Sequence, residues 1–167
     1  MEILVVRHAI AAERDARRWP DDRGRPLTPE GARRFRKVAR HLGTCGPAPQ
    51  VVWSSPLARA WQTAEILAGE ADWPAPRELA ALEPEADPAR VVDFLRGQGD
   101  RARVAVVGHE PGLSELLALL LSGRTDGVGL ELKKGGAALV RCERGVRAGG
   151  GELLWLLPPR VVSGVED

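Results

Sequence analysis

Short apolar runs alternate with segments of helical periodicity along most of the chain. Three of these runs are rich in β-branched residues, namely Ile3 to Val6, Val51 to Trp53 and Val104 to Val107. Continuous apolar runs of this kind are typical of strands buried on both faces, as in a parallel sheet. Because helical segments separate them, we predict an α/β layered fold with a largely parallel sheet.

Helix signals fill the segments between and after these strands. Each of the first three expected helices begins with an N-cap residue followed by proline, at residues 28–29, 55–56 and 87–88. Pro111 opens a Leu-rich segment that we expect to be helical as far as Gly123. Apolar residues at helical spacing predict the buried faces of the first three helices: Phe35, Val38 and Leu42; Leu57, Ala60, Trp61, Ala64 and Leu67; Val91, Val92 and Leu95.

The last part of the chain has a different pattern. Ala137 to Cys142 and Leu153 to Leu157 are apolar segments joined by a Gly-rich stretch at residues 145–151. This arrangement indicates a hairpin, so at least one strand of the sheet should be antiparallel. We find no linker, repeat or low-complexity segment that would divide the chain.

Charge and composition narrow the classes of function. The net charge of +1 provides no global field for nucleic acid or an anionic membrane, so any anion site has to be local. Cys45 and Cys142 form no metal-like or redox-like pair. The N-terminal apolar run is too short for a signal peptide, and the longest run, Leu116 to Leu121, is far below the ~20 residues of a membrane span. We therefore expect a cytoplasmic protein that binds neither nucleic acid nor membrane.

Candidate catalytic residues follow the three predicted parallel strands. Arg7 and His8 come directly after the first strand, Arg59 lies in the segment after the second, and His109 comes after the third. Ligands of an open α/β sheet bind outside the carboxyl ends of its strands. If the strands are neighbours, two arginines and two histidines can converge there, although each of them taken singly has an ordinary structural role.

Two arginines and two histidines in one cleft suit a phosphate group. Arginine binds phosphate oxygens bidentately, and the starts of nearby helices favour an anion. One neutral imidazole can attack phosphorus, while the other can be protonated and neutralise charge on the phosphate oxygens. Fixed cations make a metal unnecessary for such a transfer. A zinc site is the other use of two histidines, but Arg7 and Arg59 would repel the metal and a third ligand is not evident.

Three segments resemble the signature blocks of the histidine phosphatase superfamily: LVVRHA at 4–9, SSPLARAWQTAEIL at 54–67 and VVGHEPGL at 106–113. Residues 27–31, LTPEG, also resemble its SixA-like phosphohistidine phosphatase branch. The resemblance implies a phosphoglycerate mutase-like fold of three layers, in which helices cover both faces of a mostly parallel sheet that carries a C-terminal antiparallel hairpin. We expect one such domain over residues 1–167.

The same resemblance implies the roles of the site residues. His8 is the expected nucleophile, and Arg7, Arg59 and His109 complete the phosphate pocket, with no metal or other cofactor. Many superfamily members also carry a glutamate after the third strand, and Glu83 is the candidate general acid by its position. Four other carboxylates remain as alternatives or rim groups: Glu85, Asp87, Glu13 and Asp15. Of these, Asp87 is more simply explained as a helix N-cap.

Three polar residues near these motifs are expected to have supporting roles. Ser55 is expected to cap the second helix. Thr63, one turn after Arg59, could steady the pocket from behind. His41 lies off the apolar face of the first helix, so we expect it to be exposed. The Arg-rich stretch 13–25 is interpreted as a polar connection and a possible mobile rim.

These observations predict a metal-independent phosphatase that acts through phospho-His8 on phosphohistidine in a protein. The chain has no spare length for a lid domain, so the pocket should be shallow enough to admit a histidine on a partner helix. One alternative is a phosphomonoesterase that acts on a small phosphorylated metabolite. The other is a phosphate-binding module without turnover, which the presence of both His8 and His109 disfavours because binding needs only the arginines.

Overall fold

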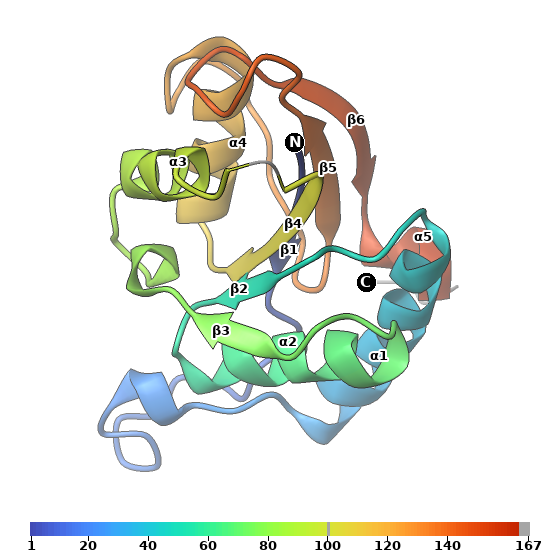
Figure 1. Cartoon of the computed structure of the whole chain (residues 1–167). Coiled ribbons are helices and arrows are strands. Elements are labelled where there is room, and N and C mark those ends of the chain that lie inside the picture. Colours follow the sequence, from blue (N-terminus) through green and yellow to red (C-terminus); the bar gives the residue numbers. More distant parts are fainter. Residues whose placement is uncertain (100, 164–167) are drawn as a thin grey trace.

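The computed structural model describes residues 1–99 and 101–163, and over these residues the chain forms a six-stranded sheet of order β3-β2-β4-β1-β5-β6 (Figure 1). Neighbouring strands run parallel from β3 through β2 and β4 to β1, whereas β5 is antiparallel to both β1 and β6. The predicted parallel sheet with a C-terminal antiparallel hairpin is therefore confirmed. The strands are β1 (Glu2–Arg7), β2 (Val52–Ser54), β3 (Pro76–Glu78), β4 (Arg103–Gly108), β5 (Ala137–Arg141) and β6 (Glu152–Leu157).

Helices cover both faces of this sheet, as expected. One face packs against α1 and α2, and the opposite face packs against α3 and α4. A short α5 after β6 contacts α1, and 3-10 turns η1 and η2 lie in the connections. The helical elements are η1 (Asp22–Gly24), α1 (Pro29–Thr44), α2 (Ala58–Glu70), η2 (Ala80–Leu82), α3 (Pro88–Arg96), α4 (Gly112–Ser122) and α5 (Pro159–Ser163).

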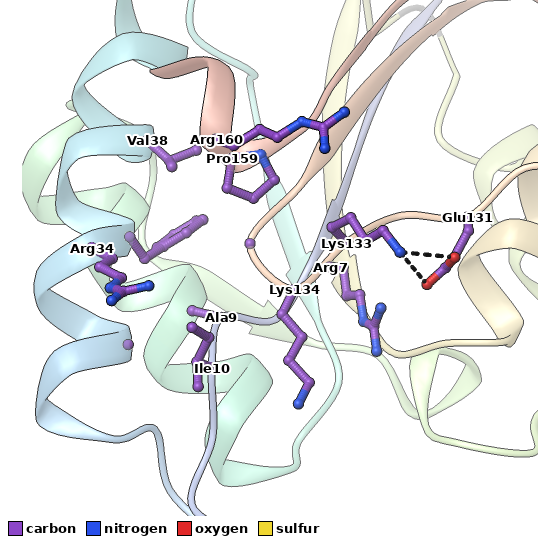
Figure 2. Close-up of a pocket in the computed structure, with 13 residues that line it drawn as sticks. Arg7, Ala9, Ile10, Arg34, Val38, Glu131, Lys133, Lys134, Pro159 and Arg160 are labelled. Carbon is purple, nitrogen blue, oxygen red and sulfur yellow. Dashed lines mark hydrogen bonds and ion pairs between the residues drawn. The ribbon is translucent and has the colours of Figure 1, made fainter. Parts of the chain in front are cut away.

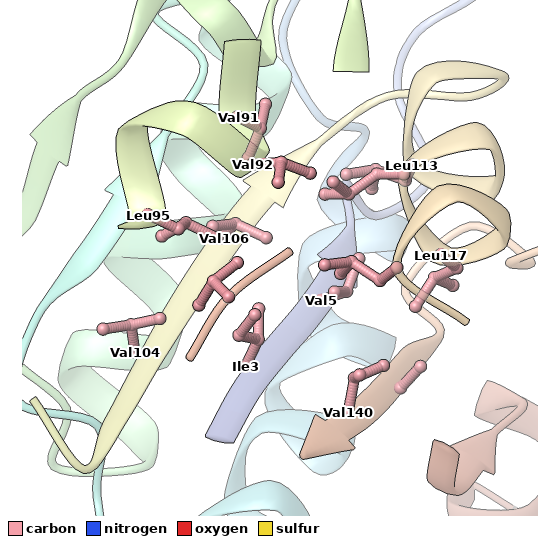
Figure 3. Close-up of a cluster of buried hydrophobic side chains, with 14 of the residues drawn as sticks. Ile3, Val5, Val91, Val92, Leu95, Val104, Val106, Leu113, Leu117 and Val140 are labelled. Atoms are coloured by element: carbon pink, nitrogen blue, oxygen red, sulfur yellow. The ribbon is translucent and has the colours of Figure 1, made fainter. Parts of the chain in front are cut away.

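Alternation along the central strands creates two hydrophobic cores. Ile3 and Val5 of β1 lie in the core beneath α3 and α4 (Figure 3). Leu4 and Val6 lie in the core beneath α1 and α2. The side chains of β4 are divided in the same way, and every residue of that strand is buried. A strand between two helical layers needs apolar side chains at every position, which explains the continuous runs in the sequence.

The helix starts follow their predicted caps in two of three cases. The side chain of Thr28 accepts a hydrogen bond from the backbone of Gly31 at 2.8 Å, and Asp87 accepts one from Ala89 at 2.8 Å. The start predicted at Ser55 is wrong, because α2 begins at Ala58 and its N-cap is Leu57. The hydroxyl of Ser55 instead meets a histidine side chain, as described below.

Two short elements were not predicted from the pattern. β3 consists of Pro76, Arg77 and Glu78, which carry no apolar alternation because the strand lies at the sheet edge. The five residues of α5 are too few to show a helical period. Trp61 was expected to be buried but is partly exposed, and Thr63 takes a buried place on α2. No helix of the described residues combines the length and apolar character needed to cross a membrane.

Candidate active site

The carboxyl ends of β1, β4 and β2 meet at one edge of the sheet. β1 and β4 pair in register as far as Arg7 and Gly108, and β2 pairs with β4 as far as Ser54. His8 and His109 are the next residues after β1 and β4, and their ring centroids lie 5.1 Å apart. The sheet register thus places the two histidines side by side.

His8 is held as a neutral imidazole with a defined tautomer. Its Nδ1 lies 2.7 Å from the carbonyl oxygen of Ala9, which can only accept, so Nδ1 carries the hydrogen. The lone pair is therefore on Nε2. Burial lowers the pKa of His8 to about 4, and the charges of Arg59 and Arg7 add to this effect, while the hydrogen bond to Ala9 opposes it. A buried neutral imidazole with a lone pair on Nε2 has the properties of a nucleophile.

His109 contacts the hydroxyl of Ser55 through Nε2, so its Nδ1 is the ring nitrogen without a partner among the described residues. Nε2 of His109 lies 2.9 Å from Oγ of Ser55, and the same oxygen accepts a hydrogen bond from the backbone of Leu57 at 3.3 Å. The hydroxyl can donate to Nε2, and in the tautomer in which Nε2 accepts this bond the ring hydrogen lies on Nδ1. Burial, followed by the neighbouring charges of His8 and Arg59, lowers the pKa of His109 to about 2. The second imidazole can thus donate to an anion without being protonated, unlike the charged form considered from sequence.

The two arginines are anchored through their terminal nitrogens. Nη1 of Arg7 donates to the carbonyl of Leu132 at 2.6 Å. In Arg59, Nη1 donates to the carbonyl of Asp22 at 3.0 Å, and Nη2 lies 3.1 Å from the carboxylate of the same residue. Nε of Arg7, Nε of Arg59 and Nδ1 of His109 are buried without a hydrogen-bond partner among the described residues. Unpaired buried donors are costly, by about 1–3 kcal/mol each, so three around one histidine favour an anionic ligand.

Sequence reasoning missed Asp22 and Arg25, which complete the charge balance of the site. The carboxylate of Asp22 contacts Arg59 and accepts a hydrogen bond from Nε of Arg25 at 2.7 Å. This hydrogen bond lowers the pKa of Asp22, whereas burial raises it. The hydrogen bond has the larger effect, so the pKa of Asp22 lies below its usual range. The stretch 13–25 was interpreted above as a polar connection and rim. It also places the carboxylate of Asp22 against the buried Arg59. One charged residue in an Arg-rich run gives no periodic signal, so the pattern could not identify Asp22.

Thr63 connects the two segments that carry His8 and Arg59. Its Oγ1 accepts a hydrogen bond from the backbone of Ala9 at 3.0 Å and donates to the carbonyl of Arg59 at 2.7 Å. Thr63 is fully buried. The expected supporting position of this residue thus has a geometric basis, because one hydroxyl fixes the spacing between the loop after β1 and α2.

Glu83 lies at the edge of the site, directly after η2. It lines a small cavity together with His109. Its carboxylate accepts hydrogen bonds from both terminal nitrogens of Arg23. Of the alternative carboxylates, Asp87 caps α3, and Asp15 accepts hydrogen bonds from the backbone of a local turn. Glu83 is thus held in an ion pair with Arg23 at the rim of the site.

Comparisons with known proteins identify the family. Residues 3–83 match the model of the histidine phosphatase superfamily (branch 1). An uncharacterized protein of Picosynechococcus sp. is 37% identical over 138 residues, which cover 81% of this chain and 82% of that protein.

Solved structures share the architecture over nearly the whole chain. The structure of the protein histidine phosphatase SixA complexed with tungstate is 28% identical, with a TM-score of 0.83 and coverage of 95% of this chain and 97% of that one. A mycobacterial glucosyl-3-phosphoglycerate phosphatase is 18% identical, with a TM-score of 0.68 and coverage of 94% and 98%, which shows the shared fold alone. The matched blocks and this common architecture establish that the chain belongs to the histidine phosphatase superfamily and has its phosphoglycerate mutase-like fold.

Proposed function

We propose that this protein is a metal-independent phosphatase that takes phosphate from phosphohistidine in a protein onto Nε2 of His8 and then passes it to water. Membership of the superfamily supports phosphatase activity. The observation that carries the proposal is the pairing of two buried neutral histidines whose ring centroids lie 5.1 Å apart. One ring offers a lone pair to phosphorus, and the other offers an N–H to a phosphate oxygen.

The first step is an in-line displacement at phosphorus. Phosphate oxygens accept hydrogen bonds from the unpaired donors, Nε of Arg7, Nε of Arg59 and Nδ1 of His109. The lone pair on Nε2 of His8 forms the new P–N bond, and the bond to the leaving imidazole breaks with its electron pair on that nitrogen. The carbonyl of Ala9 remains bonded to Nδ1–H and stabilises the positive charge that develops on the His8 ring.

The second step regenerates the enzyme. Water attacks phosphorus of phospho-His8, the bond between phosphorus and Nε2 breaks, and inorganic phosphate leaves with the lone pair restored to His8. A proton of the attacking water passes to phosphate oxygen or to solvent. The same cationic groups face both transition states, so no rearrangement of the site is required between the steps.

The leaving group favours phosphohistidine over a phosphomonoester. An alkoxide leaves poorly, so cleavage of a P–O bond gains strongly from a positioned acid. A phosphoimidazole is protonated on its own second ring nitrogen and departs as neutral imidazole. The carboxylate of Glu83, the candidate acid, is engaged by Arg23. A site without a ready acid is therefore better suited to the P–N bond.

Rapid quench with labelled phosphohistidine substrate tests the proposal. Wild-type protein should trap an acid-labile, base-stable phosphoenzyme, and His8→Ala should lose both the label and turnover. His41→Ala is the matched control, because the third histidine of the chain lies in the last turn of α1, exposed to solvent. Normal labelling of His8→Ala would exclude His8 as the nucleophile.

A substrate panel decides between the proposal and its alternatives. Phosphohistidine protein, phosphoramidate and common phosphomonoesters are compared by kcat/KM, and we expect P–N substrates to be favoured by about 10²-fold or more. A phosphomonoester that is the better substrate would establish a metabolite phosphatase instead. Phosphate binding without turnover of any substrate would leave only a binding module.

A further inference from the structure

A second cavity lies beside the candidate active site, and Arg7 of that site also lines the cavity. Its volume is about 430 Å³, and it lies between α1, the segment 131–135 and α5 (Figure 2). Neither histidine of the site lines it, nor does Arg59. We call this cavity the basic groove. Its other lining residues are Ala9, Ile10, Gly31, Arg34, Phe35, Val38, Glu131, Lys133, Lys134, Gly135, Pro159 and Arg160.

Cations dominate the polar part of the basic groove. Arg7, Arg34, Lys133, Lys134 and Arg160 line it, against one acidic residue, Glu131. The whole chain has a net charge of only +1, so this excess is local. Uncompensated like charges on one surface repel one another and attract an anionic occupant.

Not all of this charge is compensated within the protein. Lys133 forms an ion pair with Glu131 at 3.1 Å, and Arg34 forms one with Glu30 at 2.6 Å. Lys134, in contrast, makes no hydrogen bond or ion pair with any described residue. Its side chain extends in the same general direction as that of Arg7 (Figure 2). Lys134 and Arg7 thus bring positive charge to the groove, and of the two Lys134 is the wholly uncompensated one.

The basic groove is rigidly placed relative to His8. The backbone N–H of Gly135 lies 3.0 Å from the carbonyl of His8 and 3.2 Å from that of Arg7. Gly135 has φ +77°, and a Cβ there would lie 3.1 Å from the ring of Phe35. The segment that carries Lys134 is therefore pressed against both the catalytic strand end and α1. Arg7 and Ala9, the two chain neighbours of His8, line the groove, so a ligand there would lie beside the segment that carries His8.

The basic groove also has apolar surface, which favours a ligand with apolar as well as anionic groups. Ile10, Phe35, Val38 and Pro159 give it apolar surface between the cationic side chains. A compact phosphorylated metabolite offers anionic groups but little apolar surface to cover such a floor. A polypeptide with neighbouring acidic and apolar side chains offers both.

We propose that the basic groove binds acidic and apolar side chains that flank the phosphohistidine of a partner protein, with Lys134 as the principal selective cation. The proposal rests on the proposed function, because it assigns the phosphohistidine to His8 and its neighbours to the groove. The enzyme then prefers phosphohistidines in acidic, partly apolar surroundings, and this preference acts mainly through KM.

Phosphohistidine peptides test this specificity. Three peptides of equal length are compared, in which the residues beside phosphohistidine are Glu and Leu, Gln and Leu, or Glu and Ser. We expect kcat/KM for the Glu–Leu peptide to exceed that for the Gln–Leu peptide by about tenfold at low salt and by less as salt rises. Lys134→Gln should reduce this ratio about threefold, and Lys134→Arg should retain it.

Lys37→Gln is the matched control for Lys134→Gln. Lys37 is an exposed lysine on α1, one turn after Arg34, and does not line the groove. It should leave the ratio between the Glu–Leu and Gln–Leu peptides at the wild-type value. Thermal unfolding of each variant verifies that a changed ratio does not arise from a damaged fold.

The possible results distinguish a failure of the groove proposal from a failure of the proposed function. If all three peptides are hydrolysed equally and Lys134→Gln has no effect, the ligand proposed for the groove is wrong, but the proposed function still holds. Failure to hydrolyse any phosphohistidine peptide, with rapid turnover of phosphomonoesters, overturns the proposed function and the groove with it. If Lys134→Gln impairs a phosphomonoester that carries a second acid group as strongly as the Glu–Leu peptide, the occupant is a small molecule and the assignment to a protein is wrong.

Discussion

Oγ of Ser55 lies 2.9 Å from Nε2 of His109, so the hydroxyl and the ring share one hydrogen bond. The hydroxyl also accepts from the backbone of Leu57, and when its own hydrogen is donated to Nε2 the ring hydrogen lies on Nδ1. Nδ1–H of His109 is then left as a buried donor without a partner among the described residues. A serine expected to cap a helix instead contacts a histidine of the candidate site.

Replacing Ser55 by Ala should lower kcat/KM about tenfold, because His109 then loses its fixed tautomer and orientation. Steady-state kinetics with phosphoramidate measures this, and NMR of ¹⁵N-labelled histidine reports the tautomer directly. Ser54→Ala is the control, since Ser54 is equally buried but its hydroxyl donates to the carbonyl of Ser55. Unchanged kinetics and an unchanged tautomer in Ser55→Ala would contradict this role.

Replacing Asp22 by Asn should tighten the binding of inorganic phosphate or vanadate, by about fivefold. The carboxylate competes with the bound anion for Arg59 and repels it, and the amide removes that charge while keeping the shape. We expect a lower kcat at the same time, because Arg59 is less firmly held. Asp21→Asn is the control, since Asp21 caps the backbone of Arg23 and has no recorded contact with Arg59. Inhibition constants measure the effect, and weaker binding in Asp22→Asn would count against the argument.

The pH dependence of kcat/KM should reflect a nucleophile that is neutral far below pH 6.5. The pKa of His8 is lowered to about 4, so activity should stay nearly constant from pH 7 to 5 and fall by half near pH 4. Initial rates in buffers of constant ionic strength measure the profile. A midpoint close to 6.5 would show that His8 is not shielded as the structure indicates.

Stability should fall over the same acidic range. The folded pKa values of His8 and His109 are about 4 and about 2, below the 6.5 of an unperturbed histidine. Between these values the unfolded chain binds more protons than the folded one, so the free energy of unfolding decreases as pH falls below about 6.5. Urea unfolding at pH 7 and pH 5 should reveal a loss of about 4 kcal/mol, about 2 kcal/mol from each histidine. The double variant His8→Ala, His109→Ala should lack most of this slope.

Replacing Glu83 by Gln should cost little on phosphohistidine and more on a phosphomonoester such as a sugar phosphate. The P–N leaving group supplies its own protonation site, whereas an alkoxide needs a donor. kcat/KM for both substrates measures the difference. Equal collapse of both activities would make Glu83 an essential group and refute the argument from the leaving group.

Activity should survive exhaustive chelation, because the two arginines supply positive charge to the phosphate and His109 can add a neutral N–H donor. Vanadate should inhibit, since it adopts the five-coordinate geometry of phosphorus in the displacement. Assays with and without a chelator, followed by addition of Zn²⁺ or Mg²⁺, provide the measurement. Activity that is lost on chelation and restored by one of these ions would demonstrate a metal requirement.

The sequence by itself determined the interior strands and the residues at their ends. The runs at residues 3–6 and 104–107 lie in a sheet covered on both faces, where every position must be apolar. Once these strands are adjacent and parallel, the positions of His8 and His109 follow from covalent connection alone. The apolar pattern and the chain order are local properties, so they can be seen without the tertiary structure.

Only the tertiary structure decided how these residues are held and charged. Asp22 meets Arg59 across 37 positions of sequence, and Ser55 meets His109 across 54. The basic groove likewise combines α1, the segment 131–135 and α5. Tautomers, pKa values and subsite charge depend on burial and on contacts between such distant segments, which a sequence pattern does not contain.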